Sequence, residues 1–139
     1  MNASTPRCGA DCLSAASASG SSSRTPHPYQ KDVHVRMSQQ RREKDKDPVR
    51  GFLNLPTGAG KTFTMVRWLV TELLASDPSV RVIWLAHNDQ LLEQAADCFQ
   101  DEWSTLKVGA LSIKRVKGRA ELTRLEGSDA RIAVCSIAT

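Results

Sequence analysis

The sequence predicts an α/β domain in which a mostly parallel sheet is flanked by helices. Short apolar runs rich in β-branched residues alternate along the chain with helical segments, a pattern typical of βαβ units and a parallel sheet. A glycine-rich turn, LPTGAGKT at 55–62, joins the first such run to a helical segment. No helix follows the last apolar run, so we expect the domain to be incomplete at its C-terminus.

Composition divides the 139-residue chain into a tail and one domain. Residues 1–26 are rich in Ser and Ala, and we expect a disordered tail because so little apolar surface cannot offset the entropy of ordering. An organelle transit peptide is the alternative for this acid-poor start. Residues 27–139 are expected to form the domain. No apolar run is long enough to span a membrane, and a net charge of +4 suits a polyanionic partner.

The four cysteines, Cys8, Cys12, Cys98 and Cys135, form no CxxC pair. We therefore expect unpaired thiols, no zinc site and an intracellular, cytoplasmic location.

The elements follow in order from residue 29. Residues 29–47 permit a helix, which Pro48 ends; residues 49–55 form a β-type run before the loop, and 61–76 a helix with an apolar stripe. The later elements are a strand at 80–86, a helix at 87–103 capped by Asn88 or Asp89, a strand at 105–113, a basic loop with a short helix at 114–129, and a strand at 130–139.

The glycine-rich turn has the chemistry of a phosphate-binding loop. Gly58 and Gly60 allow the backbone to approach phosphate oxygens, because they lack a Cβ. The backbone amides of residues 58–62 can form an anion nest at the start of a helix. Lys61 can supply charge to the β- and γ-phosphates, and the Thr62 hydroxyl can bind Mg²⁺. Leu55 stands where the general GxxxxGK[ST] pattern has Gly.

Four stretches together resemble the superfamily 2 helicases of the DEAD/DEAH-box class, and most of all the helicase (Res) subunits of type III restriction enzymes. PYQ at 28–30 resembles the segment that reads adenine, and LPTGAGKT resembles motif I, whose first Gly this family often replaces. WLAHNDQLLEQA at 84–95 resembles motif Ia, and SIAT at 136–139 resembles the phosphate-contacting motif before the DEAH box. The resemblance covers about residues 26–139 and implies a RecA-like P-loop NTPase fold.

The resemblance implies ATP and Mg²⁺ as cofactors. The Gln30 carboxamide suits the N6 and N7 edge of adenine, and Tyr29 can pack on the base; the alternative for Gln30 is a surface residue at a helix start. The nucleotide-binding residues expected are Tyr29, Gln30, Thr57, Gly58, Ala59, Gly60, Lys61 and Thr62, with Thr62 as the Mg²⁺ ligand.

The resemblance also implies a nucleic-acid partner, DNA in preference to RNA. Four residues are expected to contact its phosphates: His87, Asn88, Ser136 and Thr139. At the position of Asn88 the family often has Arg. Helix capping and a plain strand end are the alternatives. A basic cluster is either part of the nucleic-acid groove or a solvated loop; its members are Lys114, Arg115, Lys117, Arg119 and Arg124.

Hydrolysis needs carboxylates that the family carries on a strand beyond position 139, the Walker B pair. The one Asp-Glu pair in this chain, Asp101-Glu102, has no apolar strand before it, and we interpret it as a solvated helix end.

The sequence thus predicts the ATP-binding portion of a helicase or translocase from a restriction or repair system. Its parent would be an ATP hydrolase that works with a methyltransferase or another restriction or repair subunit. The chain alone is expected to bind nucleotide without hydrolysing it. Another P-loop NTPase, such as a small-molecule kinase, and an inert truncated product are the alternatives.

Overall fold

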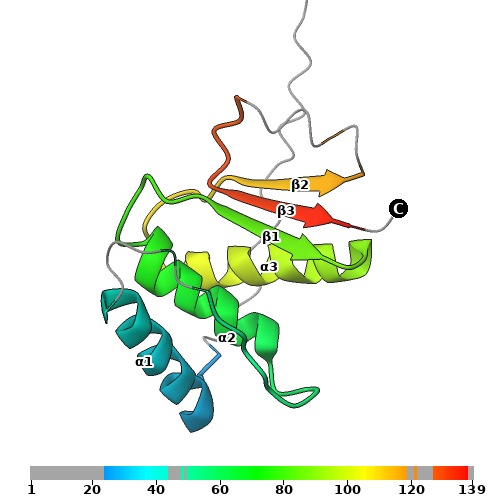
Figure 1. The fold of residues 1–139 in the computed structure, drawn as a ribbon. Helices are drawn as coiled ribbons and strands as arrows, with labels where there is room; N and C mark the ends of the chain where they lie inside the picture. Colours follow the sequence, from blue (N-terminus) through cyan, green and yellow to red (C-terminus); the bar gives the residue numbers. More distant parts are fainter. Residues whose placement is uncertain (1–23, 44–47, 49, 119–120, 122–126, 138–139) are drawn as a thin grey trace, which may run out of the picture.

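The computed structural model describes residues 24–43, 48, 50–118, 121 and 127–137, and it has an α/β fold (Figure 1). The cysteines Cys8 and Cys12 and nearly all of the tail predicted at 1–26 lie outside the described residues. The elements are α1 (Pro28–Glu43), α2 (Lys61–Trp68), the π-helix η1 (Leu69–Leu74), β1 (Val82–Ala86), α3 (Asp89–Leu106), β2 (Ile113–Lys117) and β3 (Ile132–Ser136).

The three strands form one parallel sheet in the order β1-β3-β2. Val134 of the central strand lies between Trp84 of β1 and Arg115 of β2. Residues 132–135 are all buried, as expected for a parallel strand with neighbours on both sides. The predicted parallel sheet flanked by helices is confirmed.

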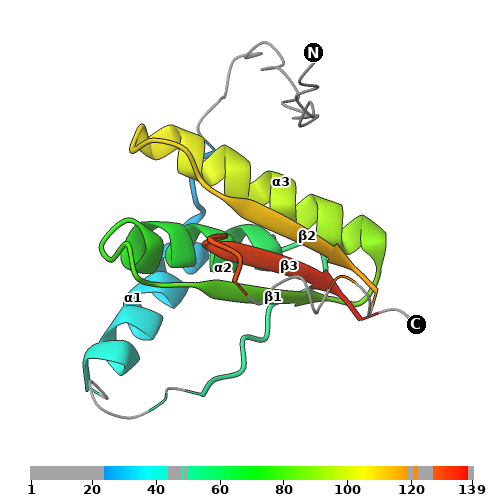
Figure 2. The ribbon, with the colours of Figure 1, turned by 90° about the horizontal axis from the view of Figure 1, so that it is seen from above.

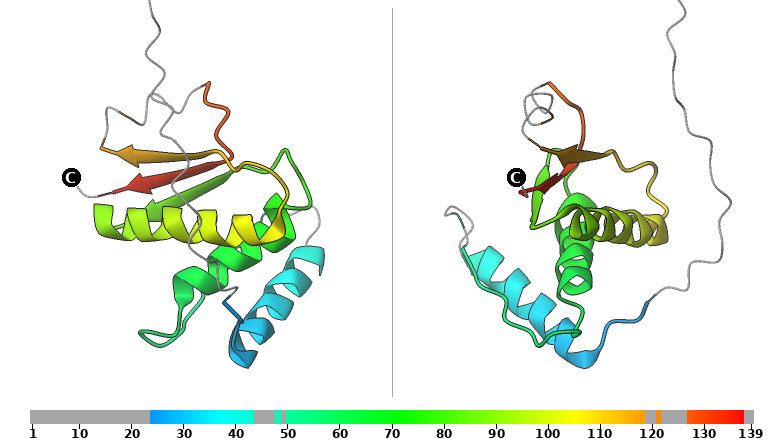
Figure 3. Two further views of the ribbon diagram at one scale, coloured as in Figure 1. Left: turned by 180° about the vertical axis from the view of Figure 1, so that it is seen from behind. Right: turned by 90° about the vertical axis from the view of Figure 1, so that its right-hand side faces the viewer.

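The described helices lie on one side of the sheet (Figures 2 and 3). α3 packs on the sheet, α2 packs against α3, and α1 lies outside α2. The core between these layers contains Phe99 of α3, which is fully buried and meets the Trp84 ring edge-on at a centroid distance of 5.5 Å. On the opposite face of β1, Ile83 and Leu85 remain exposed.

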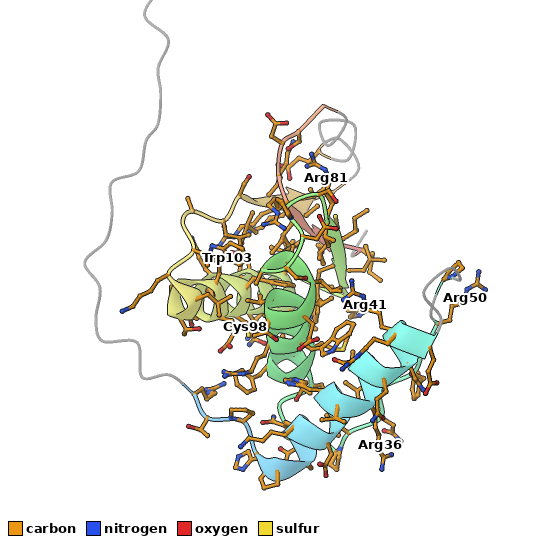
Figure 4. The ribbon with its side chains drawn as sticks, turned by 90° about the vertical axis from the view of Figure 1, so that its left-hand side faces the viewer. Arg36, Arg41, Arg50, Arg81, Cys98 and Trp103 are labelled. Atoms are coloured by element: carbon orange, nitrogen blue, oxygen red, sulfur yellow. The ribbon has the colours of Figure 1, made fainter. Side chains whose placement is uncertain are left out.

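Helix α1 is held against α2 by polar side chains, because it carries few apolar ones. His34 Nε2 lies 2.8 Å from the Thr64 carbonyl oxygen, and the Trp68 indole donates to the buried Ser38 hydroxyl at 2.9 Å. Arg41, labelled in Figure 4, donates to the carbonyl of Glu72. These bonds fix α1 beside the helix that follows the glycine-rich loop.

The helix predicted at 61–76 is present, but its second half widens into a π-helix. Val66, Val70 and Leu74 lie on its buried stripe, as the apolar spacing predicts. Arg131 donates to the carbonyls of Leu74 and Asp77 at 2.8 and 2.7 Å. The guanidinium thereby gives the Leu74 carbonyl, at the helix C-terminus, a hydrogen-bond partner and ties it to the turn that follows at Asp77.

The strand predicted at 49–55 is wrong over the residues that the structure describes. Residues 50–56 have no regular secondary structure and join no sheet, and Phe52 is 93% exposed. A β-type sequence becomes a strand only when a neighbouring strand accepts its backbone hydrogen bonds, and this segment lies beside neither edge of the sheet (Figure 2).

The strand predicted at 105–113 is also wrong, because α3 continues to Leu106 and β2 begins only at Ile113. Buried Trp103 holds the end of α3, with its indole donating to the Gly109 carbonyl at 2.8 Å. Lys107 then adopts a left-handed conformation, with φ of 54°, and ends the helix.

Residues 114–117, predicted as loop, are therefore edge strand. Their charges suit an edge, where Lys and Arg discourage pairing with other chains. Arg115 Nε and Lys117 Nζ each lie 2.7 Å from the Glu93 carboxylate of α3. These bonds lower the pKa of Glu93. The short helix expected after β2 falls mostly outside the described residues.

The described cysteines, Cys98 and Cys135, are both unpaired. Burial raises the pKa of Cys98 to about 11, so its thiol stays protonated and unreactive at neutral pH. No helix among the described residues is long and apolar enough to cross a membrane.

Candidate functional site

The glycine-rich loop leads directly into α2 and has the backbone geometry of an anion cradle. Gly58 and Gly60 have φ of 81° and 73°, values that favour glycine. The Ala59 amide donates to the Pro56 carbonyl and closes the turn. No side chain caps the start of α2 at Lys61. The first amides of this helix are therefore available to an anion, with the positive end of the helix dipole behind them.

Two side chains of α1 converge on one carbonyl of the loop. Tyr29 Oη donates to the Ala59 oxygen at 2.9 Å, and Gln30 Nε2 donates to the same oxygen at 3.2 Å. The Gln30 Oε1 accepts from the His27 amide at 2.9 Å. Gln30 is only 3% exposed, so its carboxamide is fixed. The Ala59 carbonyl thus points toward α1, and the two hydrogen bonds from α1 hold the loop in place.

A pocket of about 290 Å³ lies between α1 and the loop. The rings of His27 and Tyr29 stack at its wall, with centroids 5.6 Å apart and an angle of 6° between the planes. The volume and the flat aromatic pair suit a planar ring system. The pocket is lined by Arg24, Thr25, His27, Tyr29, Gln30, Gly58, Ala59, Gly60 and Phe63.

Sequence reasoning missed four of these lining residues. Arg24 and Thr25 fall within the predicted tail, and the sequence predicts no role for His27 or Phe63. The spacing from Gly60 to Phe63 was an available signal, because residues three apart share one side of a helix start.

Lys61 lies folded back along its own loop. Its Nζ donates to the carbonyls of Leu55 at 2.8 Å and Pro56 at 3.2 Å, and the side chain is exposed. A bound phosphate would replace these two acceptors with charged oxygens. Thr62 follows in the first turn of α2 and is partly exposed; its role as a Mg²⁺ ligand stays a prediction. Thr57 precedes the glycines and is exposed.

The residues predicted to contact nucleic acid come together at the carboxyl ends of β1 and β3. Ser136 pairs with Ala86, and the Ile137 amide donates to the Ala86 carbonyl. His87 and Asn88 follow at once and are exposed. The Ser136 hydroxyl is buried without a hydrogen-bond partner. Thr139 lies outside the described residues. This sheet end and the glycine-rich loop lie on the same side of the molecule (Figure 1).

Residues 23–139 match the family described as Type III restriction enzyme, res subunit. The chain belongs to this family. The match confirms the resemblance to superfamily 2 helicases and the RecA-like fold, and it identifies a helicase-type domain. Comparison with the curated proteins and with the solved structures found no match.

In this res domain the Asp101-Glu102 pair lies on helix α3. The prediction that Asp101-Glu102 is a solvated helix end is wrong for Glu102. Asp101 is exposed, but Glu102 is 6% exposed and bonded to Arg67 at 3.1 Å. Helix α3 turns Glu102 toward α2 because it lies on the same face as buried Phe99.

The basic cluster is partly engaged within the res domain. Arg115 and Lys117 pair with carboxylates of α3, whereas Arg119 and Arg124 lie outside the described residues. Among the described residues, no three His, Cys, Asp or Glu side chains gather as a metal site. Thr62, next to the loop, is the one metal ligand that the sequence predicts.

Asn88 caps helix α3, as one of the two capping alternatives predicted. Its Oδ1 accepts from the Leu91 amide at 2.9 Å. We expect Asn88→Ala to lower the free energy of unfolding by about 1 kcal/mol, measured by chemical denaturation. Asn88→Asp is the matched control, because aspartate caps as well as asparagine. Equal losses in the two variants would contradict the capping role.

Proposed function

We propose that the chain is the ATP-binding part of a DNA-dependent helicase or translocase of the res subunit family. The observation that carries the proposal is the loop 57–62, in which two positive-φ glycines and an uncapped helix start stand beside the pocket under α1. The cradle suits the phosphates, and the pocket suits a base. The two are joined at Ala59, where α1 holds the loop.

Lys61 and Thr62 have the central roles in the proposed site. Lys61 supplies charge to the β- and γ-phosphates once it leaves its two backbone acceptors. Thr62 binds the Mg²⁺ that accompanies the nucleotide. Tyr29 and Gln30 connect the base to the loop. Because Gln30 is already bonded on both sides, it reads adenine only through its remaining donor and lone pair.

The DNA contact proposed here is the sheet end formed by His87, Asn88 and Ser136, with Thr139 as the further candidate. Ligands of open α/β sheets bind at the carboxyl ends of the strands, and the exposed side chains of His87 and Asn88 can contact phosphate oxygens there. In this proposal the protein works inside the cell with a methyltransferase or another subunit of a restriction or repair system.

Calorimetric titration with Mg-ATP tests the proposal. We expect the 139-residue chain to bind it and Lys61→Ala to bind it more weakly by about tenfold or more, because a charged bond to phosphate is lost. Lys31→Ala, which removes an exposed lysine of α1, is the matched control and should bind normally. Absence of binding by the unaltered chain would contradict the proposal and favour the inert alternative.

We further propose that the chain alone does not turn ATP over. The Glu102 carboxylate is engaged with Arg67 and is buried on α3, so it does not serve the phosphates. A phosphate-release assay with and without DNA should stay at background. DNA-stimulated release that Lys61→Ala abolishes would overturn this part of the proposal.

A further inference from the structure

Glu102 is a buried carboxylate that the proposed nucleotide chemistry does not use. It is 6% exposed, on the face of α3 that meets α2. A buried charge is costly unless it is paired, and here the partner is Arg67, whose Nη1 lies 3.1 Å from Glu102 Oε2. Burial raises the pKa of Glu102, and the charge of Arg67 opposes that rise. Glu102 therefore fixes the position of the Arg67 guanidinium.

The same guanidinium holds the segment 24–27, which we name the strap. Arg67 Nη1 also donates to the Arg24 carbonyl at 3.2 Å. The guanidinium carbons of Arg24 and Arg67 lie 5.6 and 5.8 Å from the centroid of the Phe63 ring, within the range of cation–π attraction. Buried Phe63 thus joins the strap to the first turn of α2.

The strap forms one wall of the pocket beside the loop. Arg24, Thr25 and His27 line this pocket, whereas Lys61 and Thr62 do not. The strap therefore faces the part of the site proposed for the base, and not the part proposed for the β- and γ-phosphates. The His27 amide also bonds Gln30, so the position of the strap sets both the stacked ring pair and the Gln30 carboxamide.

We propose that Arg67, anchored by Glu102, is a positioning residue for the nucleotide base. It touches no nucleotide; it keeps the strap against Phe63, so that the pocket wall is formed before the base enters. This inference rests on the proposed ATP site and adds that base recognition depends on a contact of α2 with α3. Loss of Arg67 should weaken the binding of a whole nucleotide and spare the binding of its phosphates.

The test compares two ligands, Mg-ATP and Mg-tripolyphosphate, on the 139-residue chain by calorimetry. Arg67→Lys keeps the charge but loses the rigid planar guanidinium, whose Nη1 bonds both the Arg24 carbonyl and the Glu102 carboxylate. We expect its affinity for ATP to fall by about tenfold, the size of one lost charged hydrogen bond, while its affinity for tripolyphosphate stays unchanged. Arg24→Ala removes an exposed side chain from the strap. It should also lower the affinity for ATP relative to the affinity for tripolyphosphate.

Arg41→Lys is the matched control, because Arg41 also donates to a backbone carbonyl, between α1 and η1, but does not line this pocket. Its ratio of the two affinities should equal that of the unaltered chain. An equal loss for both ligands in Arg67→Lys would mean a merely structural role and would overturn the inference, as would no loss for either. If the unaltered chain binds neither ligand, the proposed function itself fails; if it binds both equally, only the base pocket fails.

Discussion

Gly60→Ala is expected to weaken Mg-ATP binding severely while the domain stays folded. Gly60 has φ of 73°, a conformation that an L-residue adopts only with strain. An added Cβ would also lie 3.0 Å from Gln30 Nε2, which donates to the Ala59 carbonyl. Relief of this contact must move Gln30 or the loop. Either movement displaces the amides that the phosphates need, so we expect affinity to fall by about a hundredfold, or about 2.7 kcal/mol.

Two other glycines separate the causes of that loss. Gly58→Ala introduces the same kind of backbone strain, with φ of 81°, but its Cβ would meet nothing within 4 Å. Gly51→Ala would likewise meet nothing, and Gly51 has no positive φ. In titrations with Mg-ATP the loss should be largest for Gly60, smaller for Gly58 and absent for Gly51. Equal losses at Gly58 and Gly60 would show that the contact with Gln30 is unimportant.

The sequence predicted the parts of the fold that depend on local pattern. The helix after the loop has its apolar residues at helical spacing, and the Asn88 cap stands immediately before the periodic run of α3. β3 is a continuous apolar run, and it is the buried central strand. In each of these, the residues that define the element also make its contacts.

Elements that depend on distant neighbours were not predictable in the same way. The run 49–55 has strand-like residues, yet no sheet edge adjoins its described part. Conversely, β2 is highly charged and resembles a loop in sequence, but its Arg115 and Lys117 form ion pairs with Glu93 of α3. A strand is defined by its pairing, and pairing is a long-range property that residue types only suggest.

The candidate site shows the same division. The loop 57–62 is a local motif, and both of its glycines have the positive φ that other residues adopt only with strain. The strap and Glu102 act across long sequence separations, from residue 24 to residue 102. Glu102 follows exposed Asp101, and only the rotation of α3 distinguishes the buried carboxylate from the solvated one.

Phe99→Ala should produce the largest loss of stability of any single change in the described core. The ring is fully buried and meets Trp84 edge-on. Removing such a side chain costs about 3 to 5 kcal/mol, because burial is lost and a cavity remains, and the aromatic pair adds about 0.5 to 1.5 kcal/mol. Whole domains have only about 5 to 15 kcal/mol, so the variant should be close to unfolding at room temperature.

Phe52→Ala is the matched control, since it removes the same side chain from a site that is 93% exposed. Urea titrations followed by circular dichroism should give a much lower midpoint for Phe99→Ala and an unchanged one for Phe52→Ala. Saturating Mg-ATP should raise the midpoint of both folded proteins, because a ligand that binds only the folded state shifts the equilibrium toward it. A lower midpoint for Phe52→Ala would mean that residues 50–56 pack against the domain, and this would contradict the exposed position of Phe52. An unchanged midpoint for Phe99→Ala would contradict the packing of α3 on the sheet, on which the positions of both Asn88 and Glu102 depend.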